Sequence, residues 1–123
     1  MIRWGVWNDS LGLLTGYQLF PDGTVQRYRR AYTATSDETL DTLPVRINAD
    51  THCRIADALR SAFIHNQAYT VIGPISHYVE YNTPTAALRA TWDARYETYG
   101  SRHFRAIFRW LNHSIGNDEN SYR

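Results

Sequence analysis

The chain has 123 residues, of which 43% are hydrophobic and 20% charged, which fits one globular domain and excludes an intrinsically disordered protein. The formal net charge is +1, so no overall field draws the protein toward nucleic acid or an anionic membrane. Cys53 is the single cysteine, which excludes an intramolecular disulfide and a cysteine-rich zinc site. No apolar stretch is long enough to cross a bilayer and no secretion signal opens the chain, so we expect a cytoplasmic protein.

The first third of the chain has the pattern of three strands. Residues 2–8 alternate apolar side chains with others at period two, which predicts a strand. Residues 13–20 form a second strand, and Pro, Asp and Gly at residues 21–23 supply the turn of a hairpin. The partner strand of this hairpin is expected to run over residues 24–33.

The middle of the chain predicts a connection and then a helix. Residues 34–48 are polar and largely acidic, and Pro44 argues against a helix, so we expect an irregular connection there. A helix begins near Asp50 as its N-cap and runs to about Asn66. Its apolar residues recur at intervals of three and four and form one stripe: Ile55, Ala56, Leu59, Ala62 and Phe63.

The last third predicts a hairpin and a second helix. Residues 75–82 and 86–93 have the pattern of two paired strands. The second helix begins near Ser101, and Gly116 stands where a left-handed C-cap belongs. The polar tail, residues 117–123, is expected to fray. The apolar stripe of the second helix consists of Phe104, Ile107, Phe108, Leu111 and Ile115.

The order of these elements, βββ-α-ββ-α, predicts an α+β fold. One antiparallel sheet of about five strands would carry both helices on one face. The other face would be open to solvent or to a partner. Residues 1–116 then form the single globular domain, with residues 117–123 as its tail.

The basic and aromatic residues favour a binding function over catalysis. All thirteen basic residues are arginines, and the chain also holds nine tyrosines and four tryptophans. Arginine, tyrosine and tryptophan dominate the energetic hot spots of protein interfaces. Codon bias in a GC-rich genome is the alternative explanation for the absence of lysine.

The second helix carries the first predicted partner-binding surface. Arg102, Arg105, Arg109 and His113 face away from its apolar stripe, and Trp110 lies on the flank. Such a stripe can bind phosphates or an acidic protein surface. An ordinary solvated helix face is the alternative.

The third strand carries the second predicted surface. Arg27 and Arg29 share one face of this strand, and Tyr28, Arg30 and Tyr32 share the other. Because unpaired arginines are costly to bury, we expect the tyrosines to point toward the helices and Arg27 and Arg29 to lie on the open face. There the arginines contact a partner or pair with acidic neighbours such as Glu80.

The sequence predicts no catalytic, cofactor-binding or metal-binding residues. The five histidines show no metal-ligand spacing. Cys53 adjoins His52 near a helix start, but adjacent helical residues point about 100° apart. A small half-buried hydrophobe is therefore expected at Cys53 rather than a nucleophile activated by histidine.

Together these observations predict a small protein-binding module that acts by occupying a partner surface, as inhibitors, immunity proteins and anti-defence proteins of this size do. Homodimerisation through the open sheet face is another use of the same surface chemistry. A nucleic-acid-binding protein that uses the second helix or residues 27–30 is an alternative. A small enzyme is another, with a site assembled from distant residues: His77, Tyr78, Glu80 and Asp93.

Overall fold

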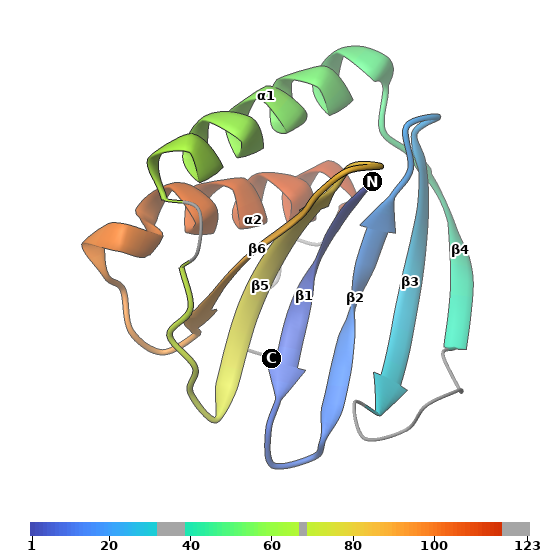
Figure 1. Cartoon of the computed structure of the whole chain (residues 1–123). Coiled ribbons are helices and arrows are strands. Elements are labelled where there is room, and N and C mark those ends of the chain that lie inside the picture. Colours follow the sequence, from blue (N-terminus) through green and yellow to red (C-terminus); the bar gives the residue numbers. More distant parts are fainter. Residues whose placement is uncertain (32–38, 67–68, 117–123) are drawn as a thin grey trace.

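The computed structural model describes residues 1–31, 39–66 and 69–116. These residues form one antiparallel sheet of six strands in the order β4-β3-β2-β1-β5-β6, with two helices on one face of it (Figure 1). The predicted α+β class is therefore confirmed. The elements in chain order are β1 (Ile2–Asn8), β2 (Leu13–Leu19), β3 (Thr24–Ala31), β4 (Thr39–Arg46), α1 (Ala49–His65), β5 (Ile75–Asn82), β6 (Ala87–Asp93), the 3₁₀ turn η1 (Tyr99–Ser101) and α2 (Arg102–Ser114).

The additional strand, β4, lies where the sequence predicted only an irregular connection. It pairs with β3 at the edge of the sheet, where Pro44 is tolerated because an edge strand has N–H groups that no neighbouring strand needs. Leu43 and Val45 pack against the core. The order of the described elements is thus ββββ-α-ββ-α. Residues 32–38, which include part of the predicted connection and the end of the predicted third strand, lie outside the described residues.

Both helices begin close to the predicted positions. The N-cap of α1 is Asn48 rather than Asp50, and Asn48 Oδ1 accepts a hydrogen bond from the Thr51 N–H at 2.8 Å. Asp50 lies in the first turn, where the helix dipole favours a carboxylate. α2 follows Ser101, as predicted, and Gly116 comes after its last turn with a φ of 79°.

Both predicted hairpins are present. β2 and β3 are joined through Gly23, whose φ of 91° glycine adopts without strain. β5 and β6 pair along almost their whole length. The predicted tail, residues 117–123, lies outside the described residues. No helix among the described residues is long and apolar enough to cross a membrane.

The core lies between the sheet and the helices, with Trp4 at its centre. Trp4 is fully buried, and its Nε1–H donates to Asn112 Oδ1 at 2.9 Å, so a buried hydrogen bond joins β1 to α2. His77 on β5 stacks on Phe108 of α2, with ring centroids 4.6 Å apart. The apolar stripes predicted for both helices are buried in this core.

The opposite face of the sheet holds a second, smaller cluster around Tyr28 and Tyr78. Gly5 and Gly16 lie between these tyrosines in cross-strand register and leave room above the sheet for both rings. The two hydroxyl groups form a hydrogen bond over the glycines. Only 2% of Tyr28 and 1% of Tyr78 is exposed. Burial raises the pKa of the Tyr28 hydroxyl above its ordinary value.

Replacing one tyrosine of this pair should cost more stability than replacing both. Tyr28→Phe or Tyr78→Phe leaves the other hydroxyl buried without its partner, so each should lower the free energy of unfolding by about 1–3 kcal/mol. The double variant removes both hydroxyls and should lie within about 1 kcal/mol of the wild type. Urea denaturation of the four proteins measures this coupling. Additive losses would show that the two hydroxyls act independently.

Candidate functional site

α1 and α2 run antiparallel (Figure 1). Residues of both helices line an open groove between them. Its volume of about 550 Å³ is within the range of ligand-binding clefts. From α1 it is lined by Ala58, Ser61, Ala62 and His65. From α2 it is lined by Arg102, His103, Ala106, Ile107 and Trp110.

The groove forms because small side chains stand where the two helices meet. Ala58 and Ala62 are one turn apart on α1, and Ala106 lies across the groove on α2. Ala62 and Ile107 are buried and form an apolar floor, whereas Ala106 is exposed. Trp110 is half-buried and packs against the core from the side of the groove. A partner that covers this apolar surface gains hydrophobic free energy.

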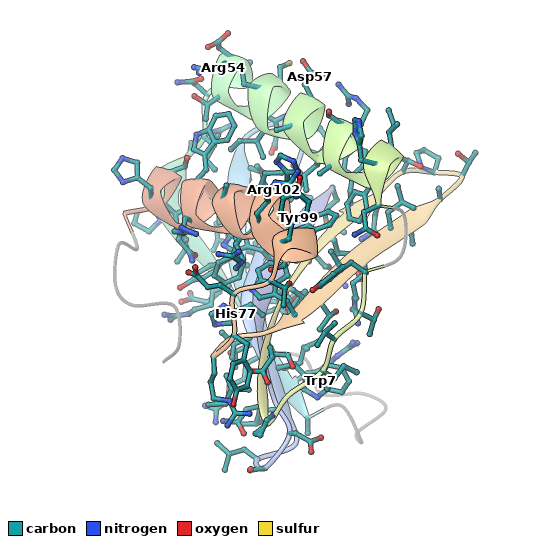
Figure 2. The ribbon with its side chains drawn as sticks, turned by 90° about the vertical axis from the view of Figure 1, so that its left-hand side faces the viewer. Trp7, Arg54, Asp57, His77, Tyr99 and Arg102 are labelled. Carbon is teal, nitrogen blue, oxygen red and sulfur yellow. The ribbon has the colours of Figure 1, made fainter. Side chains whose placement is uncertain are left out.

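An arginine stacked on an aromatic ring stands at each end of the groove. At one end, Arg54 lies over Trp110, 5.6 Å from the ring centroid. At the other end, Arg102 lies 3.6 Å from the ring centroid of Tyr99 and donates to the Tyr99 carbonyl oxygen at 2.9 Å. Figure 2 shows Arg54 on α1 and the Arg102–Tyr99 pair at the start of α2. Each stack restrains a guanidinium group that keeps further N–H donors for a ligand.

The titratable side chains that line the groove are all of basic residue types. Arg102, His65 and His103 line it, and no acidic side chain of the described residues does. His65 Nδ1 lies 2.9 Å from the Ser61 carbonyl oxygen, and because a carbonyl oxygen only accepts, Nδ1 carries the proton. Within the described residues, no carboxylate lies within ion-pair distance of Arg102. The groove therefore favours a ligand with acidic groups.

The predicted binding stripe of α2 separates into parts that face different surroundings. Arg102 and Trp110 line the groove. Arg109 and His113 are exposed on the adjacent outer side of α2 and do not line it. Four of the five predicted residues of α2 thus lie on the outward side of the helix layer, where a partner has access to them.

Arg105, the fifth predicted residue of α2, turns toward η1 instead. It donates to Ser101 Oγ at 2.8 Å and to the Thr98 carbonyl oxygen at 3.0 Å. It also pairs with Glu97 at 3.2 Å, and only 16% of its side chain is exposed. Its charge is satisfied within the chain, so its contacts support the start of α2.

The prediction that Arg27 and Arg29 lie on the open face of the sheet is wrong. The strand register sets Arg27 opposite Tyr17, and Tyr17 packs against Trp4 under the helices. Arg27 and Arg29 are nevertheless exposed, because β3 extends beyond the helix layer (Figure 1). Arg27 pairs there with Asp41 of β4 at 3.0 Å.

The expectation that Tyr28 points toward the helices is also wrong, because the strand register puts Tyr28 on the face opposite Arg27. Tyr28 lies on the face away from the helices and is buried there against Tyr78. Arg30 shares that face and is exposed. Tyr32 lies outside the described residues.

Arginines cover the buried tyrosines on the face away from the helices. Arg3 lies over Tyr28 at 5.4 Å from the ring centroid, and Arg89 lies over Tyr78 at 5.3 Å. Arg89 also pairs with Glu80 at 2.8 Å. Single-stranded nucleic acids stack their bases on exposed aromatic rings, and these two rings are not exposed. This face therefore does not favour the nucleic-acid alternative.

The residues of the enzyme alternative do not converge. His77 is buried against α2, whereas Tyr78, Glu80 and Asp93 belong to the opposite face of the sheet. Hydrogen bonds from Arg95 lower the pKa of the Asp93 carboxyl, which makes it a weaker base. In the part of the chain that the structure describes, no group of His, Cys, Asp and Glu side chains could hold a metal ion.

Cys53 is exposed, not half-buried as the sequence predicted. It lies on the side of α1 that also carries Asp57 and Arg60, four and seven residues further along the chain, and both are exposed. The buried stripe begins at Ile55 and Ala56, so Cys53 has no apolar surface to cover.

Sequence reasoning missed the α1 half of the groove. Ala58 and Ser61 belong to no motif that indicates a binding site. The one indication in the sequence was the spacing of Ala58 and Ala62, which places two small side chains one helical turn apart. Small residues one turn apart allow a second helix to approach closely, but the sequence does not say which helix does so. Tyr99 was missed because it precedes the predicted start of α2.

Comparison with known proteins identifies no relative. No protein-family model matches the chain, and neither a curated protein nor a solved structure shows significant similarity to it. The chemistry of the groove and of its two ends is therefore the basis for assigning a function.

Proposed function

We propose that the protein is a small protein-binding module that occupies a partner's surface through the groove between α1 and α2. The observation that carries this proposal is the meeting of Trp110 and Arg102, two predicted partner-binding residues, at a groove of about 550 Å³ with an apolar floor. Tryptophan and arginine beside a pocket that a partner can desolvate are typical of interface hot spots. Arg109 and His113, on the adjacent side of α2, extend the contact as a polar rim.

The mode of action is occupation of the partner and not chemistry on it. Inhibitors, immunity proteins and anti-defence proteins are built at this size, and this class analogy supports such a role. We propose the cytoplasm as its location. A free, exposed Cys53 is compatible with a reducing compartment.

The proposal predicts a partner whose binding depends on the groove. Affinity capture from an extract of the source organism, with nuclease added, should recover one protein in stoichiometric amount. Ala106→Glu puts a carboxylate in the groove, and Trp110→Ala removes its aromatic wall. Each variant should weaken binding of that protein at least about tenfold.

Ala49→Glu is the matched control for Ala106→Glu. It makes the same substitution on the exposed first turn of α1, outside the groove, and should leave capture unchanged. Capture that is unaffected by both groove variants would contradict the proposal. Recovery that nuclease abolishes would favour the nucleic-acid alternative, and a stable dimer without another protein would favour homodimerisation.

A further inference from the structure

The two stacked arginines are separated along the axis of the groove. Arg102 and Trp110 are eight residues apart on α2. Arg54 lies over Trp110 and Arg102 over Tyr99, and the backbone rises about 12 Å along the helix axis from Arg102 to Trp110. Small and apolar side chains, Ala58 and Ala106 among them, line the interval. The groove thus presents a cation, an apolar stretch and a second cation in that order.

Neither arginine is held by a strong ion pair among the described residues. Arg102 has no carboxylate within ion-pair distance there. Arg54 lies 4.0 Å from Asp50, and 66% and 84% of their side chains are exposed. An exposed pair of this kind contributes little to stability. A carboxylate of a partner can therefore bind either guanidinium group without displacing a costly contact.

The surroundings favour a helix as the ligand. A third helix packs its side chains against both walls of a groove between antiparallel helices, as in a helical bundle. Addition of a strand is disfavoured at both sheet edges. At the β4 edge, Pro44 lacks the backbone N–H that an added strand would need. At the β6 edge, the Thr91 N–H already donates to the Tyr69 carbonyl oxygen at 2.9 Å, and the Thr91 carbonyl oxygen accepts from the Val71 N–H at 3.0 Å.

We infer that the groove binds an acidic amphipathic helix of the partner protein. The helix sets apolar side chains at i, i+3 or i+4, and i+7 on the floor of the groove. Two carboxylates about seven to eleven residues apart on that helix reach Arg54 and Arg102, since this spacing covers the rise of about 12 Å from Arg102 to Trp110 and of about 16 Å from Tyr99 to Trp110. The inference rests on the proposed function, because it names the ligand of the same groove.

A displayed peptide library tests the chemistry of the ligand. Random peptides of about sixteen residues can form a helix of about 24 Å. They are selected for binding to the full wild-type chain, and peptides that also bind the Ala106→Glu variant are discarded. We expect enrichment of amphipathic sequences with paired acidic residues at the stated spacing. Arg102→Glu should weaken the enriched peptides at least about tenfold, and Arg30→Glu, exposed on β3 and outside the groove, less than about threefold.

Enrichment of basic or extended peptides, enrichment of acidic peptides without the spacing, or no enrichment would each overturn the inference. So would equal effects of Arg102→Glu and Arg30→Glu. The proposed function fails separately. If a partner is captured through the groove but the library yields no acidic peptides of the stated spacing, the proposed function stands and the inference of an acidic helix is wrong. If such peptides are enriched but no partner is captured from the extract, the preference of the groove for an acidic helix is supported and the proposed function is wrong.

Discussion

Trp4→Ala should lower the free energy of unfolding by about 4 kcal/mol. Trp4 is fully buried and packs against Tyr17, with ring centroids 5.4 Å apart. The substitution opens a cavity between β1 and α2. It also leaves Asn112 Oδ1 buried without the donor that it has in the wild type. Urea denaturation followed by circular dichroism measures the loss.

Trp110→Ala removes the same side chain from a half-buried position and is the matched control. Because Trp110 is partly exposed at the groove, its loss should lower the free energy of unfolding by less than about 1.5 kcal/mol. The variant should therefore stay folded and be usable in binding experiments. Similar losses for the two tryptophans would contradict their assignment to the centre of the core and to its rim.

Gly5→Ala should lower the free energy of unfolding by about 3 kcal/mol or more. Gly5 on β1 lies opposite Gly16 on β2. A Cβ atom at Gly5 would overlap the Thr15 carbonyl oxygen and the Gly16 Cα, which are main-chain atoms and cannot rotate away. The two strands would have to separate locally, and β1 lies inside the sheet, where its neighbours on both sides are affected.

Gly12→Asn is the control for Gly5→Ala. Gly12 has a φ of 62°, a conformation that asparagine tolerates, and a Cβ there meets nothing within 4 Å. This variant should lose less than about 1 kcal/mol. Thermal unfolding of both proteins compares them. If Gly5→Ala proves as mild as Gly12→Asn, the close approach of β1 and β2 is contradicted.

Local periodicity was enough to predict most of the fold. The alternation in residues 2–8 and the three- and four-residue spacing in α1 each identify an element that buries one side. Gly23 and Gly116 marked a turn and a helix end because both adopt positive φ. β4 was missed because its polar residues and Pro44 suit a loop equally well, and only its pairing with β3 makes it a strand.

The candidate site was predictable only in part, since it depends on how far the helices extend over the sheet. Alternation showed correctly that Arg27 and Tyr28 lie on opposite faces. It could not show that the helices stop short of Arg27, which leaves this arginine exposed on their side. The groove itself depends on the packing of α1 against α2, which brings Ala58 and Ala106 to one groove, and no local pattern records which distant segments pack together.

Site-specific photo-crosslinking tests the groove most directly. Benzoylphenylalanine is introduced in place of Ala106, in the groove, and separately in place of Ala49, on the exposed first turn of α1. The chain is then irradiated in an extract of the source organism. We predict an adduct from position 106 to one partner protein, through an acidic helical segment, and none from position 49. Adducts of equal yield from both positions, or no adduct from position 106, would contradict the assignment of the groove as the binding site.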